Sequence, residues 1–206
     1  MSRRNRSRNR DRRPKARDNR HASIEGRLAE VSEDELYEQL ESQRDPKALI
    51  LVLDEVTDPH NLGACLRSAN AAGTVAIVTP KHHSVRVTET VQRIACGAAA
   101  TTPVVTVANL ARAMRKLQEL GFSLVGTDDS GGEMLYDIDL TGPVAIVAGA
   151  EGKGLRRLTR ETCDHLAQIP MLGNVECLNV SVATGVCLFE VVRQRRKTAR
   201  GGGGKP

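Results

Sequence analysis

The sequence has very few aromatic residues, and this scarcity limits the ways in which the protein can bind nucleic acid. Tryptophan is absent, and Phe and Tyr occur only twice each in 206 residues. RNA-binding modules that stack bases on a protein surface need several exposed aromatic side chains. Any contact with nucleic acid must therefore come from charge, shape and backbone groups.

The sequence also lacks a long hydrophobic run. No apolar stretch approaches the roughly 20 residues that cross a bilayer, and no apolar segment follows the basic N-terminus as a secretory signal requires. No two of the five cysteines form a CxxC pair, which disfavours a zinc site and favours reduced thiols. We therefore expect a cytoplasmic protein with no metal and no membrane partner.

Positive charge is concentrated at the two ends of the chain. Residues 1–20 contain ten Lys/Arg and two Asp, and residues 193–206 contain six Lys/Arg and no acidic residue. The two ends thus carry +8 and +6 while the whole chain carries +5, so residues 21–192 carry −9. A polyanion is expected to meet the basic ends first.

The composition divides the chain into two tails, a linker and one domain. Residues 1–20 have almost no apolar side chains, which predicts a disordered tail that is either solubilising or RNA-binding. We favour an RNA-binding arm, because its cations attract the phosphates of RNA of any sequence. The arginines of this arm that we expect to bind RNA are Arg3, Arg4, Arg6, Arg8, Arg10, Arg12 and Arg13. Residues 21–47 are expected to be a linker with a short acidic helix, residues 48–196 the domain, and residues 197–206 a disordered basic and glycine-rich tail.

From residue 48 onward, apolar strands alternate with amphipathic helices. The expected strands are continuous apolar runs, typical of a parallel sheet covered on both faces: Ala48–Leu53, Val75–Thr79, Pro103–Val107, Ser123–Gly126 and Val144–Ala148. Helices are expected near Glu33–Gln43, Leu62–Ala72, Thr88–Cys96, Leu110–Leu120, Leu155–Glu161 and Leu178–Arg196. This alternation predicts an α/β fold with ligands at the carboxyl ends of its strands.

The first of three polar loops follows the strand that is expected to end at residue 53. It runs into a helix with the sequence DEVTDPHNLGACLRSA at residues 54–69. Asn61 has the right side chain to be the N-cap of that helix. Arg67 lies six residues further on among mostly apolar neighbours, a setting in which a charge usually needs a partner or a function.

The second loop, GAEGKGL at residues 149–155, contains three glycines directly after a predicted strand. It does not match the phosphate-binding pattern GxxxxGK[ST], and Arg157 excludes the dinucleotide pattern GxGxxG. A nucleotide-dependent oxidoreductase or kinase is therefore disfavoured. Glu151 could cap the next helix, but its place in a glycine loop at a strand end favours a role in a site.

The third segment, IPMLGNVECLNVSVATGV at residues 169–186, leads through a glycine loop into a helix of small residues. Asn179 and Ser181 could act as N-terminal capping groups of that helix. Ala183 and Gly185 have side chains small enough for another backbone to pack closely, either within the fold or across a dimer.

The blocks DPHNLGACLRSANAAG, VAGAEGKGL and IPMLGNVECLNVSVATGV resemble, in this order, the three signature motifs of the SpoU (TrmH-like) RNA ribose 2′-O-methyltransferases of the SPOUT superfamily. The resemblance covers residues 48–196 and favours a guanosine of 23S ribosomal RNA over transfer RNA as the substrate. It implies a parallel α/β sheet flanked by helices, with a C-terminal deep trefoil knot, an exception to the rule that chains avoid knots. It also implies a homodimer.

The same resemblance implies roles for individual residues. The implied catalytic residues are Asn61, Arg67, Glu151 and Asn179. The implied methyl donor is S-adenosylmethionine, held by the second and third loops through Gly149, Ala150, Gly152, Ile169, Met171, Leu172, Gly173, Cys177, Leu178 and Ser181. Members of the family often have serine at the position of Cys177, and a thiol is a weaker hydrogen-bond donor than a hydroxyl.

A guanidinium keeps its proton at neutral pH, so we do not expect Arg67 to act as a base. We expect it to grip a phosphate and to stabilise negative charge, while Asn61, Glu151 and Asn179 orient the ribose hydroxyl.

Relatives of the ribosomal type carry an RNA-binding domain ahead of the catalytic one, and residues 1–47 are too short to hold it. A transfer RNA methyltransferase and a non-catalytic RNA-binding dimer therefore remain as alternatives.

Overall fold

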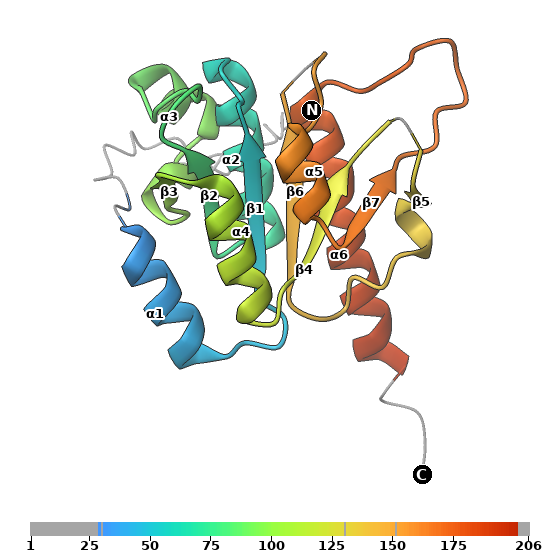
Figure 1. Cartoon of the computed structure of the whole chain (residues 1–206), viewed down its shortest axis with the longest axis horizontal. Coiled ribbons are helices and arrows are strands. Elements are labelled where there is room, and N and C mark those ends of the chain that lie inside the picture. The colour runs from blue at the N-terminus through green and yellow to red at the C-terminus, as the bar shows by residue number, and fades with distance from the viewer. Residues whose placement is uncertain (1–28, 30, 130, 151, 202–206) are drawn as a thin grey trace, which may run out of the picture.

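The protein forms one sheet of seven parallel strands that is covered by helices on both faces (Figure 1). The computed structural model describes residues 29, 31–129, 131–150 and 152–201. Across the sheet the order is β3-β2-β1-β6-β4-β7-β5. The strands are β1 Leu49–Asp54, β2 Ala76–Pro80, β3 Val104–Val107, β4 Ser123–Thr127, β5 Glu133–Met134, β6 Val144–Gly149 and β7 His165–Gln168. The predicted α/β class with a parallel sheet is confirmed.

The helices occupy the segments between the strands. They are α1 Glu33–Gln43, α2 Pro59–Ala72, α3 Glu89–Ala95, α4 Leu110–Glu119, α5 Arg157–Thr162 and α6 Val180–Gly201, with short 3₁₀ turns η1 Ala98–Ala100 and η2 Leu135–Asp137. In Figure 1, α4 and α5 lie in front of the sheet, whereas α2 and α6 lie behind it. Every helix among the described residues is too short or too polar to span a membrane.

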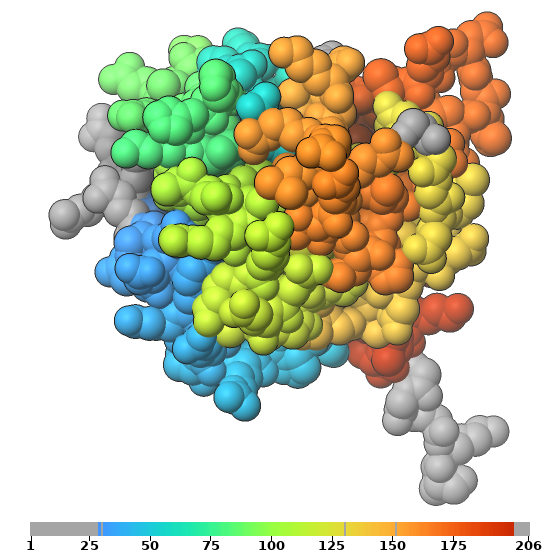
Figure 2. All heavy atoms as spheres, in the orientation of Figure 1, coloured from blue at the N-terminus to red at the C-terminus, as the bar shows by residue number. Residues whose placement is uncertain are grey.

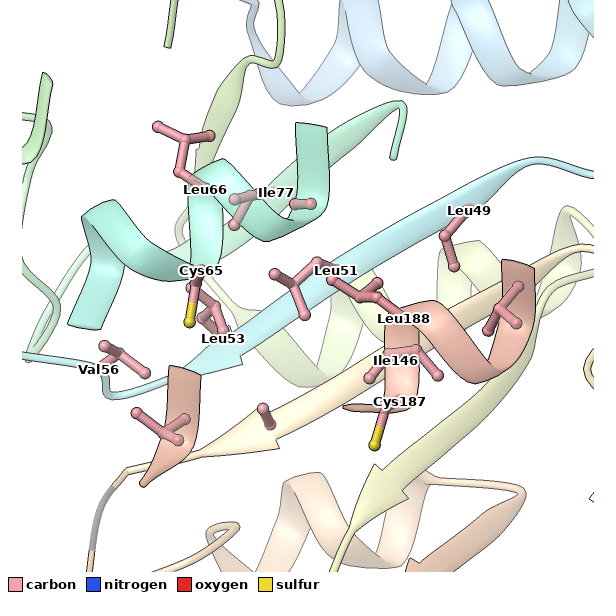
Figure 3. Packing of buried hydrophobic residues seen from close by; sticks show 14 of the residues in the cluster. Leu49, Leu51, Leu53, Val56, Cys65, Leu66, Ile77, Ile146, Cys187 and Leu188 are labelled. Atoms are coloured by element: carbon pink, nitrogen blue, oxygen red, sulfur yellow. The ribbon is translucent and has the colours of Figure 1, made fainter. Parts of the chain in front are cut away.

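Strand β1 shows how the sheet is buried on both faces. All six of its residues are buried, and successive side chains point to opposite sides of a strand. Leu49, Leu51 and Leu53 pack with α2 and α6 in one apolar cluster, which Figure 3 shows from close by. Ile50 and Val52 pack with α1 and α4 in the other cluster. Because both faces are covered, the polar groups at the carboxyl ends of the strands are left as the natural place for a ligand.

Three sequence-based expectations need correction. Asn61 is not the N-cap of α2, because the helix begins earlier, at Pro59, with the Asp58 carboxylate accepting a hydrogen bond from the backbone N–H of His60 at 2.9 Å. Proline is favoured in the first turn of a helix, where its missing N–H costs nothing. Strands β5 and β7 were not expected. Helix α6 continues to Gly201, beyond the expected end at residue 196.

Candidate active site

A cavity of about 630 Å³ opens at the carboxyl ends of β4, β6 and β7. Because these three strands are parallel, the segments that follow them lie at the same edge of the sheet. The cavity wall includes residues that follow each strand, together with the first turns of α6: Thr127, Asp128, Asp129, Gly149, Ala150, Gly152, Lys153, Gly154, Leu155, Arg160, Ala167, Gln168, Ile169, Met171, Glu176, Cys177, Leu178, Val180 and Ala183. The second and third polar loops of the sequence thus meet around one space.

The glycine loop turns back sharply on the end of β6. Ala150 and Gly154 form an antiparallel bridge. Gly152 and Gly154 have φ angles of +75° and +64°, which residues other than glycine rarely adopt. A Cβ atom on Gly149 would lie 2.2 Å from the carbonyl group of Gly154. The loop can fold this closely only because glycine occupies these positions. Glu151 lies outside the described residues.

The first and third loops meet through two asparagine side chains. The Asn179 Nδ2 donates a hydrogen bond of 3.0 Å to the Asn61 Oδ1, across 118 residues of sequence. The Asn179 Oδ1 accepts hydrogen bonds from the backbone N–H of Ser181 at 2.9 Å and from its hydroxyl at 2.6 Å. Because the backbone N–H can only donate, the amide orientation of Asn179 is fixed, and its Nδ2 must face Asn61. Asn179 therefore caps α6 and positions Asn61 at the same time.

A buried ion pair joins the end of β1 to the exit of the glycine loop. The Asp54 side chain is fully buried, and its two oxygens accept hydrogen bonds from the Nε and Nη2 of Arg156 at 2.7 Å each and from the Arg156 backbone N–H at 3.1 Å. The Nη1 of Arg156 also lies 3.2 Å from the Glu55 carboxylate. These contacts hold the loop that leads to Asn61 against the segment that borders the cavity.

The structure brings together most of the residues predicted to bind the donor. Seven of them line the cavity: Gly149, Ala150, Gly152, Ile169, Met171, Cys177 and Leu178. The other three, Leu172, Gly173 and Ser181, are not part of its wall, and the Leu172 side chain is 99% exposed. The tail arginines that were predicted to bind RNA lie outside the described residues.

Arg67 is not at the cavity. Its side chain is exposed on α2, and it takes part in none of the ion pairs among the described residues. Six residues correspond to about 9 Å along a helix, so Arg67 lies more than a turn beyond Asn61. The apolar neighbours seen in the sequence face the core instead of surrounding the guanidinium.

Sequence reasoning missed several cavity residues. Asp128 and Asp129 follow β4, and the Asp128 carboxylate pairs with the Nε of Arg160 at 2.6 Å beside the opening. The rule that ligands bind at the carboxyl ends of strands could have found both acids, because a strand was predicted to end at residue 126. No group of three or more side chains suited to bind a metal ion occurs within the described ranges.

The cysteines fall into two groups. Burial raises the pKa of Cys65 to about 11 and the pKa values of Cys163 and Cys187 to about 12, so these thiols stay protonated at neutral pH. Cys96 and Cys177 are exposed. Cys177 also lines the cavity, where a bound molecule would cover it.

The parallel α/β sheet of this chain is the fold of solved SpoU methyltransferases, and the site at its carboxyl edge joins a glycine-loop cavity to a hydrogen-bonded asparagine pair. The profile of the SpoU rRNA Methylase family matches residues 48–189, and the chain belongs to this family. The matched range contains all three polar loops.

Similar proteins with assigned activities are named 23S rRNA (guanosine-2′-O-)-methyltransferase RlmB. The one from Bordetella pertussis is 55% identical over 185 residues, which are 88% of this chain and 74% of the relative. The one from Ralstonia nicotianae is 59% identical over 162 residues, which are 79% of this chain and 64% of the relative.

Solved structures of the family have the same fold. The SpoU methyltransferase AviRb from Streptomyces viridochromogenes, in complex with the cofactor AdoMet, has a TM-score of 0.69 and 31% identity over 74% of this chain. The match covers 62% of AviRb, so the chain spans less than two thirds of that protein. The A. aeolicus TrmH/SpoU tRNA modifying enzyme has a TM-score of 0.68 and 27% identity, covering 81% of this chain and 86% of its own.

Proposed function

We propose that the protein transfers a methyl group from S-adenosylmethionine to the ribose 2′-hydroxyl of a guanosine in 23S ribosomal RNA. The observation that carries this proposal is the convergence of three segments that are distant in the sequence. The second and third loops enclose one cavity, and Asn179 at the end of the third loop bonds to Asn61 of the first. Relatives with 55% and 59% identity carry the name of this activity.

The cavity fits S-adenosylmethionine in size and lining. Its volume of about 630 Å³ falls in the range of about 300–1,000 Å³ that is typical of small-molecule sites. Backbone groups of Gly149 and Ala150 and the apolar side chains of Ile169, Met171 and Leu178 would hold the donor. When bound, S-adenosylmethionine supplies a methyl group on a positively charged sulfur, which is already an activated leaving group.

The protein must therefore align the ribose oxygen and assist the loss of its proton. Such alignment can supply about 7–11 kcal/mol of the barrier. We assign Asn61 and Asn179 to orienting the hydroxyl, because their mutual hydrogen bond fixes both side chains. Glu151 is proposed to act beside them. The exposed guanidinium of Arg67 is proposed to grip the phosphate next to the target ribose and to stabilise developing negative charge on the oxygen.

Replacement of Arg67 by alanine tests this assignment. We expect Arg67→Ala to lower turnover on the order of 10²–10³-fold, by analogy with the loss of one oxyanion-stabilising donor. Its affinity for S-adenosylmethionine, measured by calorimetry, should stay at the parental value, because Arg67 does not line the cavity. Arg115→Ala on α4, across the sheet, is the matched control and should keep parental turnover. A parental rate for Arg67→Ala would show that the proposed role is wrong.

The choice of RNA is tested by offering two substrates in parallel. We expect methyl transfer to 23S ribosomal RNA transcribed in vitro and none to transfer RNA. Transfer to transfer RNA alone would instead support the alternative activity, which the similarity to the A. aeolicus enzyme keeps open. Binding of the donor without transfer to either RNA would favour a non-catalytic RNA-binding protein. Ribosomal RNA as the substrate also supports a cytoplasmic location.

Two features of the family are proposed for this chain as well. A homodimer is supported by Val182 and Phe189, which are 52% and 49% exposed and lie seven residues apart on one face of α6. The domain at residues 48–196 is proposed to include a deep trefoil knot in its C-terminal part. The family membership and the non-sequential strand order, with β6 between β1 and β4, support this topology.

A further inference from the structure

A group of basic side chains lies on the loop between β2 and α3 and on α3 itself. Lys81, His82, His83, Arg86 and Arg93 are all exposed, and we call them the 81–93 surface. Residues 59–109 contain four Lys/Arg and one acidic residue, although residues 21–192 as a whole carry −9. Positive charge is therefore gathered on this layer of an otherwise acidic body.

These cations differ in their surroundings from those across the sheet. Arg112 and Lys116 of α4 each form an ion pair with a glutamate of α1. Among the described residues, none of the ion pairs includes Lys81, Arg86 or Arg93. A phosphate that binds such side chains displaces only water and mobile ions, and the release of counterions from the nucleic acid favours binding.

The loop is held in place although its charged groups are exposed. Val85 and Val87 pack against the core on either side of Arg86, so Arg86 points outward. The backbone N–H of Val85 donates a hydrogen bond of 3.0 Å to the carbonyl of Val56, in the loop that leads to α2. A surface held in one conformation loses little entropy when it binds a ligand.

The 81–93 surface lies at the same edge of the sheet as the candidate active site. Strand β2 pairs with β1, and β1 pairs with β6, all in parallel. The loops after β2 and β6 are therefore two strand spacings apart, which is about 10 Å. In Figures 1 and 2 the green α3 region and the orange segment near residue 150 both occupy the upper edge of the molecule. An RNA strand that reaches the cavity can thus also reach these cations.

The basic N-terminal sequence joins the body on this same layer. The backbone N–H of Ala29 donates a hydrogen bond of 3.1 Å to the carbonyl of Ala99 in η1, and η1 contacts both α2 and α3. The described chain therefore begins on the same layer as α3.

We propose that the 81–93 surface binds RNA phosphates next to the methylated nucleotide. It sets the register of the RNA strand over the cavity, because phosphate contacts position a nucleic acid without reading its sequence. This inference rests on the proposed function, and it adds an RNA contact on the folded body to the one expected from the tail.

Salt titration of RNA affinity tests the proposal in the full-length protein. The variant is Lys81→Gln/Arg86→Gln/Arg93→Gln, and the control is Arg112→Gln/Arg115→Gln/Lys116→Gln on α4, which removes the same charge. The probe is 23S ribosomal RNA transcribed in vitro, and S-adenosylmethionine affinity is measured alongside. Each lost phosphate contact lowers the slope of log affinity against log salt by about 0.7. The variant should therefore lose about 2 from the slope and bind RNA on the order of 10²-fold more weakly at 0.1 M salt.

The control should change the slope by less than half as much, and both proteins should bind S-adenosylmethionine like the parent. A parental slope in the variant, or an equal loss in the control, would overturn the proposal. If the parent methylates RNA while the variant binds RNA normally, only the 81–93 surface is refuted. If the parent does not bind RNA at all, the proposed function fails with it.

Discussion

The ion pair between Asp54 and Arg156 gives the sharpest prediction about what holds the site together. Arg156→Ala removes two of the three hydrogen bonds that the fully buried Asp54 carboxylate accepts from Arg156. Removing one partner of a buried ion pair typically costs about 3–5 kcal/mol, because the other charge stays buried and unpaired. The Arg156 side chain is 46% exposed, so water can partly replace it. We therefore expect the free energy of unfolding to fall by about 2–3 kcal/mol.

Urea unfolding measures this loss, and the neighbouring arginine supplies the control. With a denaturant slope of about 2 kcal/mol/M, the unfolding midpoint of Arg156→Ala should fall by roughly 1–1.5 M. The Arg157 side chain is 87% exposed, and its one ion pair among the described residues is with Glu161, one turn along α5, so Arg157→Ala should stay within about 0.5 kcal/mol of the parent. S-adenosylmethionine affinity should also fall in Arg156→Ala, because the pair holds the border of the cavity. Equal midpoints for the two variants would refute this reasoning.

Three further predictions concern the cavity and α6. A thiol reagent should label Cys96 and Cys177 in the native protein, and S-adenosylmethionine should slow labelling of Cys177 alone, as peptide mapping would show. Gly149→Ala should cost about 1–3 kcal/mol of stability and most of the donor affinity, whereas Gly142→Ala, where a Cβ meets nothing within 4 Å, should change neither. The hydrogen bond from Arg193 lowers the pKa of Glu190 below its usual 4.5, so its contribution to stability exists above that pH and disappears as the pH falls through the lowered value. Glu190→Gln should therefore destabilise the protein by about 1 kcal/mol at pH 7, and urea titrations at successively lower pH should show this difference shrinking below pH 4.5.

Long apolar strands could be predicted from the sequence, and short ones could not. A run such as that of β1 must be buried on both faces, so its place in a parallel sheet follows from its composition. Strand β5 has only two residues, and β7 is the partly polar sequence HLAQ. Neither carries a periodic signal, and both owe their place to pairing with neighbours that are distant in the sequence.

In the candidate site, too, some residues could be predicted from local sequence patterns and others could not. Glycines after a strand and asparagines before a helix are local patterns, so Gly149 and Asn179 could be selected as site residues from the sequence. The partnership of Asp54 with Arg156 spans 102 residues, and no local pattern predicts it. The direction of the Arg67 side chain does not follow from its neighbours in the sequence, because these apolar residues of α2 are buried against the core while Arg67 itself faces solvent.

The most direct test is to map 2′-O-methyl groups in 23S ribosomal RNA from cells with and without this protein, and from cells that carry Asn179→Ala. Because Asn179 joins the first loop to the third, we expect one guanosine to lose its methyl group in the deletion strain and to be poorly methylated with the variant. An identical methylation map in all three strains would contradict the assignment of these loops to ribosomal RNA methylation.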